Sequence, residues 1–404
     1  MSISIIEFST ENFQIFKKRV SFSMLTRKSE HSFKRNRQNL LKTSLIYGPN
    51  ASGKSTLLAA FIILKQQIIN STNNLEGSNL PYHPFLLSSD KNKASFFEVV
   101  FILDEKIFRY NFSILKNEII SENLFEIISG GKEKKYLTRE RQVIKVFYDL
   151  KESKNVKEIT RKEVLFLSAA AQWKNNFAAE IIGGFKNINI ISGPDSGGYG
   201  GYTVKLFKEN PDMKKKILDF LKMADFCIDD GSVEKMELPD FVKKDMGLKF
   251  KDFPKEVDTI FFSHNKFDSK NKFIGIEKIN MGDESRGTQK FFDILGPIVD
   301  TLENGKVLLI DEFDNSLHPF LTKFIIDLFE KKNSKNAQLI ATTHDTSILS
   351  YPDFIKDQFW FTEKDKYGAG SLISLAEFSL RNDTEYSKKY LEGKFGALPY
   401  IQLV

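Results

Sequence analysis

The sequence predicts an α/β fold in which a phosphate-binding loop joins a buried strand to a helix. Three observations carry this prediction. The stretch 48–56 matches the pattern G-x-x-x-x-G-K-[ST] without a mismatch. The apolar run 307–310 ends in Asp311 and Glu312, and a second apolar run covers 338–343. Short apolar runs of this kind are typical of the buried strands of a parallel sheet.

The predicted phosphate-binding loop lies between an apolar strand, 44–47, and a helical stretch, 57–64. Its glycines let several backbone N–H groups face one small volume, where the dipole of the helix N-terminus also favours an anion. Lys54 can then reach the outer phosphates of a nucleoside triphosphate, and Ser55 can ligate Mg²⁺. The residues expected to bind the nucleotide are Gly48, Pro49, Asn50, Ala51, Ser52, Gly53, Lys54, Ser55 and Thr56.

The run 307–312 reads as a Walker B strand. Asp311, at its carboxyl end, is expected to hold the Mg²⁺ that bridges the phosphates, and Glu312 to polarise the attacking water. The next predicted strand ends in His344, one strand–helix–strand unit later. We expect His344 to contact the γ-phosphate and the water. The catalytic residues predicted from the sequence are thus Glu312 and His344, and the metal ligands are Ser55 and Asp311.

The chain is expected to fold as a discontinuous core. Residues 1–154 are predicted to form its N-terminal half, with the phosphate loop and an antiparallel β arm that includes a hairpin over 96–112. Residues 155–264 read as a mainly helical insert, with a helix start at Asn210 and Pro211 and a flexible glycine-rich loop over 196–201. Residues 265–404 then supply the C-terminal half of the core.

Composition favours a cytoplasmic protein. The chain of 404 residues has a single cysteine, Cys227, which excludes a disulfide framework and fits a reducing compartment. No apolar run approaches the roughly 20 residues that a membrane span needs, and the first residues lack the basic and apolar regions of a secretion signal. No membrane contact is expected.

Positive charge is concentrated just before the phosphate loop. The stretch 17–42 contains nine Lys and Arg residues and one acidic residue, Glu30, in a chain whose net charge is +6. One interpretation is a single solvated basic loop. The other is contact with ATP phosphates, nucleic acid or an acidic partner.

With these motifs assembled, the chain resembles ABC-class ATPases of the SMC-like branch, and more narrowly the RloA and AbiL-type phage-defence ATPases. The segment 265–268 matches N-K-x-D, the motif that recognises guanine in GTPases. In GTPases the metal-binding motif precedes N-K-x-D, whereas here the predicted metal-binding strand follows it. We therefore expect ATP as the nucleotide. The resemblance is carried by the phosphate loop and by the segments 284–288, 311–319, 357–361 and 390–399.

This resemblance implies a fold and partners. It implies a P-loop ABC-type core in which Ser285, Gly287 and Thr288 form the signature that contacts ATP held by another subunit, hence a homodimer or larger assembly. It also implies a separately encoded effector, in some systems a Toprim-like nuclease. Only about sixty residues follow His344, too few for such a nuclease on this chain. The signature reads Ser-Arg-Gly-Thr, which disfavours a transporter ATPase, and no Q-loop glutamine can be assigned.

The leading functional hypothesis is an ATP-hydrolysing sensor or scaffold of an abortive-infection system. Two alternatives stay open. One is an SMC-like ATPase that acts on nucleic acid, for example in DNA repair. The other is a nucleotide-gated interaction protein with negligible turnover.

Overall fold

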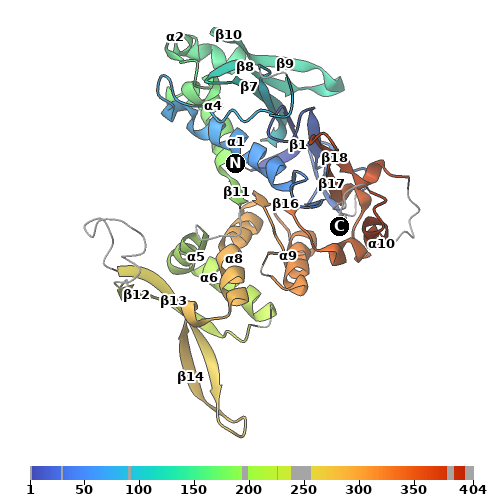
Figure 1. The fold of residues 1–404 in the computed structure, drawn as a ribbon. Coiled ribbons are helices and arrows are strands. Elements are labelled where there is room, and N and C mark those ends of the chain that lie inside the picture. The colour runs from blue at the N-terminus through green and yellow to red at the C-terminus, as the bar shows by residue number, and fades with distance from the viewer. Residues whose placement is uncertain are drawn as a thin grey trace. The chain divides into compact units, whose positions relative to one another are not determined.

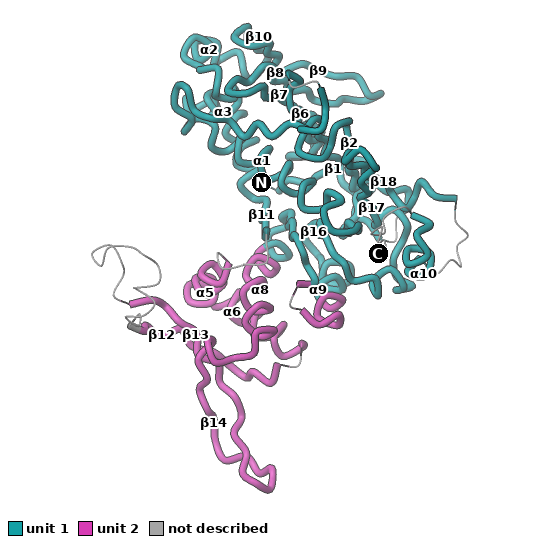
Figure 2. Tube along the Cα trace, viewed as in Figure 1, with its two compact units in different colours: residues 1–192, 301–314, 325–404 teal, residues 193–300, 315–324 magenta. Residues whose placement is uncertain are grey.

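A computed structural model of the chain describes residues 2–28, 31–89, 92–192, 199–224, 226–237, 256–315, 317–379 and 386–395 (Figure 1). The chain divides into two compact units (Figure 2). Unit 1 comprises residues 1–192, 301–314 and 325–404, and unit 2 comprises residues 193–300 and 315–324. Both units combine sheet with helix, so the predicted α/β fold class is confirmed.

Unit 1 contains a six-stranded sheet in the order β11-β15-β16-β5-β17-β18. Its neighbours are parallel except β17 and β18, which pair antiparallel. The apolar runs at 307–310 and 338–343 are confirmed as buried strands of this sheet. The bounds are β5 Thr43–Tyr47, β11 Ile188–Ile191, β15 Val307–Ile310, β16 Gln338–Thr342, β17 Phe359–Lys364 and β18 Gly370–Ser374.

A second, seven-stranded sheet of unit 1 is antiparallel throughout, in the order β10-β9-β8-β7-β6-β1-β2. The predicted hairpin is confirmed: β6 and β7 pair in register across a turn at Asp104 and Glu105. The bounds are β1 Ile3–Glu11, β2 Val20–Ser23, β6 Ser95–Leu103, β7 Lys106–Leu115, β8 Glu118–Ile127, β9 Glu133–Glu140 and β10 Val143–Val146.

Helices of unit 1 pack against this framework through one large apolar cluster, which includes Phe8, Phe61, Phe101 and Phe185. The ring of Phe8 on β1 meets Phe61 edge-on, and Phe101 on β6 meets Phe185 in the same way. These helices are α1 Lys54–Asn70, α2 Val156–Ile159, α3 Phe166–Gln172 and α4 Asn176–Lys186. A further helix, α10 Tyr386–Leu391, lies outside this cluster, and its Tyr390 stacks on Phe361 of β17.

The domain boundaries of the structure differ from those predicted at residues 155 and 264. Residues 155–192 belong to unit 1, because Phe166 and Ile181 are fully buried in its apolar cluster. Helical periodicity places 155–192 on helices correctly, but it does not tell which core those helices join.

Unit 2 combines helices with strands, and the segment 155–264, predicted to be one mainly helical insert, is divided between the two units. Unit 2 holds a three-stranded antiparallel sheet in the order β12-β13-β14, and alternate side chains of β13, Ile260 and Phe262, are buried. The bounds are β12 Asp230–Glu237, β13 Glu256–Phe267, β14 Phe273–Asn280, α5 Tyr199–Glu209 and α6 Pro211–Met223. Two helices, α8 Arg286–Asn304 and α9 Pro319–Lys331, have residues in both units.

Two local predictions fall in unit 2. The helix start at Asn210 is confirmed, because its side-chain oxygen accepts from the backbone N–H of Met213 and Pro211 opens α6. The predicted glycine-rich loop over 196–201 lies in part outside the described residues. Its last three residues, 199–201, are the start of α5 and not a loop. A side chain at Gly200 would lie 2.7 Å from Oδ1 of Asp293, so close packing explains this glycine.

The basic stretch 17–42 is not one loop. It contributes β2, and two further strands, β3 Ser32–Arg35 and β4 Gln38–Leu41, form a small antiparallel ribbon. Several of its cations contact groups of the same chain. Arg19 pairs with Glu98, Arg35 donates to Oγ of Ser4 at 2.7 Å, and Nζ of Lys42 donates to the carbonyl of Glu330 at 2.8 Å.

No helix within the described part of the chain is both long enough and apolar enough to cross a lipid bilayer.

Candidate functional site

The candidate site lies at one edge of the six-stranded sheet. Strands β5, β16 and β15 are parallel neighbours, so their carboxyl ends meet at the same edge. The phosphate loop follows β5, His344 follows β16, and Asp311 and Glu312 follow β15. This edge is where open α/β sheets bind their ligands. The topology therefore brings the predicted phosphate, metal and catalytic residues of unit 1 together.

The phosphate loop adopts backbone conformations that its glycines permit. Gly53 has φ +118°, and a side chain there would lie 2.8 Å from Cδ1 of Ile15. At Gly48, a side chain would clash with Thr362 and Ser52, whose hydroxyls are themselves hydrogen-bonded at 2.6 Å. Both positions thus require glycine, because neighbouring side chains leave no room for a Cβ atom and because other residues rarely adopt these positive φ angles. Thr56 donates its hydroxyl to Oε1 of Gln14 at 3.1 Å, which ties the loop to the N-terminal segment.

Lys54 opens α1 and is 6% exposed. Its Nζ donates to the carbonyl oxygens of Gly48 at 2.7 Å and Pro49 at 3.1 Å, so the ammonium group lies inside the curve of the loop. Burial lowers the pKa of Lys54 to about 8, against the opposing attraction of Asp311, Asp314 and Glu312. A desolvated cation in this position gains from an anion, and the phosphates of a nucleotide would supply one.

Asp311 and Glu312 are fixed by the hydroxyl of Thr342 on the neighbouring strand. Thr342 Oγ1 donates to Oδ1 of Asp311 at 2.5 Å and accepts from the backbone N–H of Glu312 at 2.8 Å. The backbone N–H of Phe313 donates to the carbonyl of Thr342 at 2.9 Å. Glu312 has φ +50°, a left-handed conformation that costs a non-glycine residue about 1–2 kcal/mol. The three hydrogen bonds hold the two acidic residues in this turn.

His344 lies in the same electrostatic environment. Its backbone N–H donates to the carboxylate of Asp314 at 3.0 Å. Burial, and then the charge of Lys54, lower the pKa of His344, while Asp314, Glu312 and Asp311 oppose that shift. This shift of the pKa favours the neutral imidazole, in which one ring nitrogen donates a hydrogen bond and the other accepts one.

The predicted signature residues lie in unit 2 and form a helix cap. The hydroxyl of Ser285 accepts from the backbone N–H of Thr288 at 3.1 Å and lies 2.8 Å from the hydroxyl of Thr288, while α8 begins at the residue after Ser285. Ser285 is exposed and Gly287 half-buried. Because these residues and Lys54 belong to different units, their role stays a prediction.

Magnesium and a nucleotide suit the donors at the sheet edge. Ser55 and Asp311 offer a hydroxyl and a carboxylate, the oxygen ligands that Mg²⁺ prefers, and Mg²⁺ in such sites takes its other ligands from phosphates and water. Within the described ranges, no cluster of three or more His, Cys, Asp or Glu side chains could hold a metal ion. The pair Ser55 and Asp311 therefore fits a metal that enters with a nucleotide.

Sequence reasoning overlooked two residues that organise the site, Thr342 and Asp314. Both lie inside segments that the sequence had singled out, 341–345 and 311–319. A hydroxyl residue directly after an apolar strand was an available signal for Thr342. Its pairing with Asp311 nevertheless depends on the register of β15 and β16, in which Ile310 lies opposite Ala341.

These features define the chain as a nucleotide-binding protein of the AAA/ABC ATPase class. More narrowly, the chain belongs to the family described as "AAA domain, putative AbiEii toxin, Type IV TA system", whose model matches residues 44–171 and 231–350, more than half of its length. The two matched segments contain the phosphate loop, the signature segment, Asp311, Glu312 and His344.

Two solved structures share a distant likeness with the chain. The "SMC head domain from Thermotoga maritima" is 13% identical, with 93% of this chain and 99% of that chain covered and a TM-score of 0.43. The "SmcHead bound to the C-winged helix domain of ScpA" is 13% identical, with 92% and 97% covered and a TM-score of 0.47. At these TM-scores neither likeness bears on function. The search of curated proteins gave no match.

Proposed function

We propose that this chain is a Mg²⁺-dependent ATPase that acts as the sensor or scaffold of an anti-phage system and controls a separately encoded effector. The observation that supports hydrolysis is the convergence of Lys54, Asp311, Glu312 and His344 at one sheet edge, where their charges interact. The family description, which includes a toxin–antitoxin system, supports the defence role. The narrower relation to RloA and AbiL-type ATPases remains part of this proposal.

Each residue at the sheet edge has a separate role in hydrolysis. The loop N–H groups and Lys54 bind and orient the triphosphate. Ser55 and Asp311 would hold Mg²⁺, which when bound neutralises charge on the phosphates. Glu312 accepts a proton from the attacking water, and neutral His344 hydrogen-bonds to the water or the γ-phosphate. Thr342 keeps the carboxylate of Asp311 and the backbone of Glu312 in place.

The decisive experiment measures ATP binding and steady-state ATP hydrolysis by the full chain. Glu312→Gln should retain nucleotide binding and lower turnover about 100-fold or more, the size of a general-base effect. Lys54→Ala should instead weaken binding, because a phosphate-facing cation is lost. Glu76→Gln, at an exposed carboxylate outside the site, is the matched control and should behave as wild type. Wild-type turnover in Glu312→Gln would refute the assignment.

Control of a separate effector can be tested in a bacterial host. The chain expressed alone should not arrest growth, whereas coexpression with the effector should arrest growth upon phage infection, and only with Glu312 intact. Growth arrest by the chain alone would show that it is itself the toxin and would overturn the regulatory part of the proposal while leaving the ATPase part standing. The single cysteine, Cys227, is compatible with action in the cytoplasm.

A further inference from the structure

We infer that unit 1 carries a binding site for single-stranded nucleic acid, in a hollow beside Trp173 that is separate from the ATPase residues. The hollow has a volume of about 710 Å³ and is lined by residues of the segment 159–174 together with Thr72. Such a volume accommodates a nucleotide unit. We call it the Trp173 hollow. This inference does not depend on the proposed function.

Trp173 is presented as a platform on one wall. It ends α3 and is 63% exposed, unusual for the largest apolar side chain. The turn that carries it is firmly held: the N–H groups of Trp173 and Asn175 donate to carbonyls of α3 at 3.0 Å, and buried Asn175 caps α4. Lys174 adopts φ +63° in this turn. A rigid turn with an outward aromatic ring favours stacking of a planar group.

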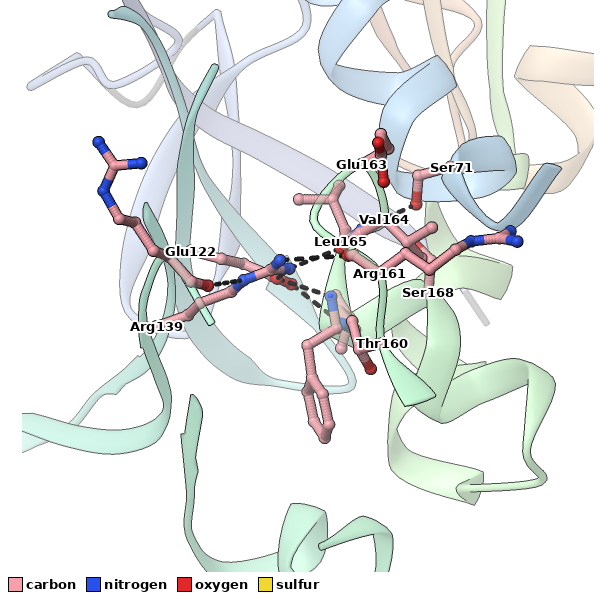
Figure 3. Close-up of polar contacts among 12 residues, drawn as sticks. Ser71, Glu122, Arg139, Thr160, Arg161, Glu163, Val164, Leu165 and Ser168 are labelled. Atoms are coloured by element: carbon pink, nitrogen blue, oxygen red, sulfur yellow. Dashed lines mark hydrogen bonds and ion pairs between the residues drawn. The ribbon is translucent and has the colours of Figure 1, made fainter. Parts of the chain in front are cut away.

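Another part of the lining, residues 160–164, is fixed by a buried ion pair (Figure 3). Arg139 donates to the carbonyl of Val164 at 2.5 Å and to that of Arg161 at 3.3 Å, and it pairs with Glu122, which is also fully buried. The side chain of Arg161 remains exposed, although its guanidinium donates to the carbonyl of Asn74 at 2.6 Å. Both parts of the lining are therefore preformed, and binding need not order them.

The positively charged residues that line the hollow favour an anionic ligand. Arg161 and Lys174 both line it, and no acidic side chain occurs among the described residues that do so. Ile159, Val164 and Ala169 provide the apolar surface between them. An aromatic ring flanked by cations fits a base and its phosphates, with little dependence on sequence. A wholly apolar protein segment fits less well, because it would desolvate both cations without a partner.

The test uses the fluorescence of Trp173. The chain has two tryptophans, and the other, Trp360, is 8% exposed, so quenching by a ligand reports on Trp173. Single-stranded oligo-dT and oligo-U of 15 residues, the matching duplexes and the mononucleotides are titrated at low salt. Quenching by single strands but neither by duplexes nor by mononucleotides is the expected result. If mononucleotides quench the fluorescence with the same affinity as the single strands, the hollow is a nucleotide site and the assignment to nucleic acid is overturned.

Variants locate the contact independently of fluorescence, through the anisotropy of a labelled single strand. Trp173→Ala should weaken binding roughly 5- to 150-fold, the range of one base stack, and Trp173→Phe should retain most of the affinity. The double variant Arg161→Gln, Lys174→Gln should reduce the slope of log K against log salt by about 1.4. Lys145→Gln, an exposed cation outside the hollow, and Lys54→Ala should change neither quantity.

Three results would overturn the inference. One is the absence of single-strand binding at low salt. A second is equal affinity of wild type and Trp173→Ala, when thermal unfolding confirms that the variant is folded. A third is binding of the dye ANS that depends on Trp173 without any response to oligonucleotides, which would assign the hollow to a protein partner.

Discussion

Thr342 shows how one hydroxyl can position two functional residues, Asp311 and Glu312. It is fully buried, and it acts as donor to Asp311 and acceptor for the Glu312 backbone at the same time. Glu312 has φ +50°, and a non-glycine residue keeps such a conformation only when the surrounding structure holds it there. Backbone strain of this kind is concentrated at functional sites. The position of Glu312 therefore depends on a fully buried side chain of the neighbouring strand β16.

We therefore expect Thr342→Val to raise the Mg²⁺ concentration needed for half-maximal hydrolysis and to lower turnover about tenfold to a hundredfold, since a hydrogen bond to a charged group contributes about 1.5–3 kcal/mol. Measurement of ATPase rates against Mg²⁺ checks this, and Thr342→Ser should restore most of the loss. Thr43→Val is the matched control, because the hydroxyl of Thr43 is equally buried in the same sheet but has no hydrogen-bond partner among the described residues. Unchanged Mg²⁺ dependence in Thr342→Val would contradict the positioning role.

The burial of Lys54 leads to a prediction about how the free energy of unfolding depends on pH. Its pKa is about 8 in the folded chain, below the ordinary value of 10.5, so folding disfavours the charged form. That cost is fully present below pH 8 and disappears as pH rises from 8 toward 10.5, where the folded site releases its proton before the unfolded chain does. Without nucleotide, Lys54→Met should unfold at higher denaturant concentration than wild type at pH 7. The gap should narrow between pH 8 and 10.5, and a constant gap would contradict burial as its cause.

At the scale of elements, a buried ion pair joins the antiparallel sheet to the helices that pack on α1. Glu122 on β8 accepts from the N–H groups of Phe166 and Leu167 at 2.6 and 2.9 Å, so it caps α3, and Arg139 on β9 lies beside it. The end of α1 is joined to the same segment, because Ser168 donates to the carbonyl of Ile68 at 2.7 Å. These residues connect α1, the helix that follows the phosphate loop, to the seven-stranded antiparallel sheet (Figure 3).

Glu122→Gln should therefore destabilise unit 1 strongly, by about 3–5 kcal/mol, because removing one partner leaves a buried charge uncompensated. The comparison is Glu118→Gln on the same strand, whose pair with Arg141 is exposed and should contribute at most about 1 kcal/mol. Urea unfolding of the two variants gives the difference directly. Similar midpoints for both would show that the buried pair is not a structural anchor.

The site could be predicted from the sequence because the strands that carry it are buried on both faces. Strands β15 and β16 are continuous apolar runs, and polar residues after such runs must lie at the sheet edge, so Asp311, Glu312 and His344 could be placed together. The core to which 155–192 belongs could not be predicted, since periodicity marks a buried face without naming its partner. The same limit applies to Arg19, which precedes β2: its partner Glu98 is distant in sequence and comes close because β1 pairs with both β2 and β6.

At the scale of the whole molecule, we propose that a second copy of the chain completes the ATP site. Lys54, Asp311 and Glu312 belong to unit 1, and Ser285, Gly287 and Thr288 to unit 2. If the exposed start of α8 completes the site of a partner chain, hydrolysis requires association, and preorganised N–H donors of this kind are a large catalytic contribution. Glu312→Gln with ATP should accordingly form a stable dimer or larger assembly in light scattering.

A mixing experiment tests this sharing without knowledge of the interface. Lys54→Ala and Ser285→Ala are each expected to be inactive, yet in their mixed dimer one site carries both lesions and the other carries none. Random pairing should thus restore roughly a quarter of wild-type activity per chain. The control mixture is Lys54→Ala with Glu312→Gln, whose lesions lie in the same unit of each chain, so neither site of the mixed dimer is intact and no activity should return. Equal results from the two mixtures would contradict a site built from unit 1 of one chain and unit 2 of its partner.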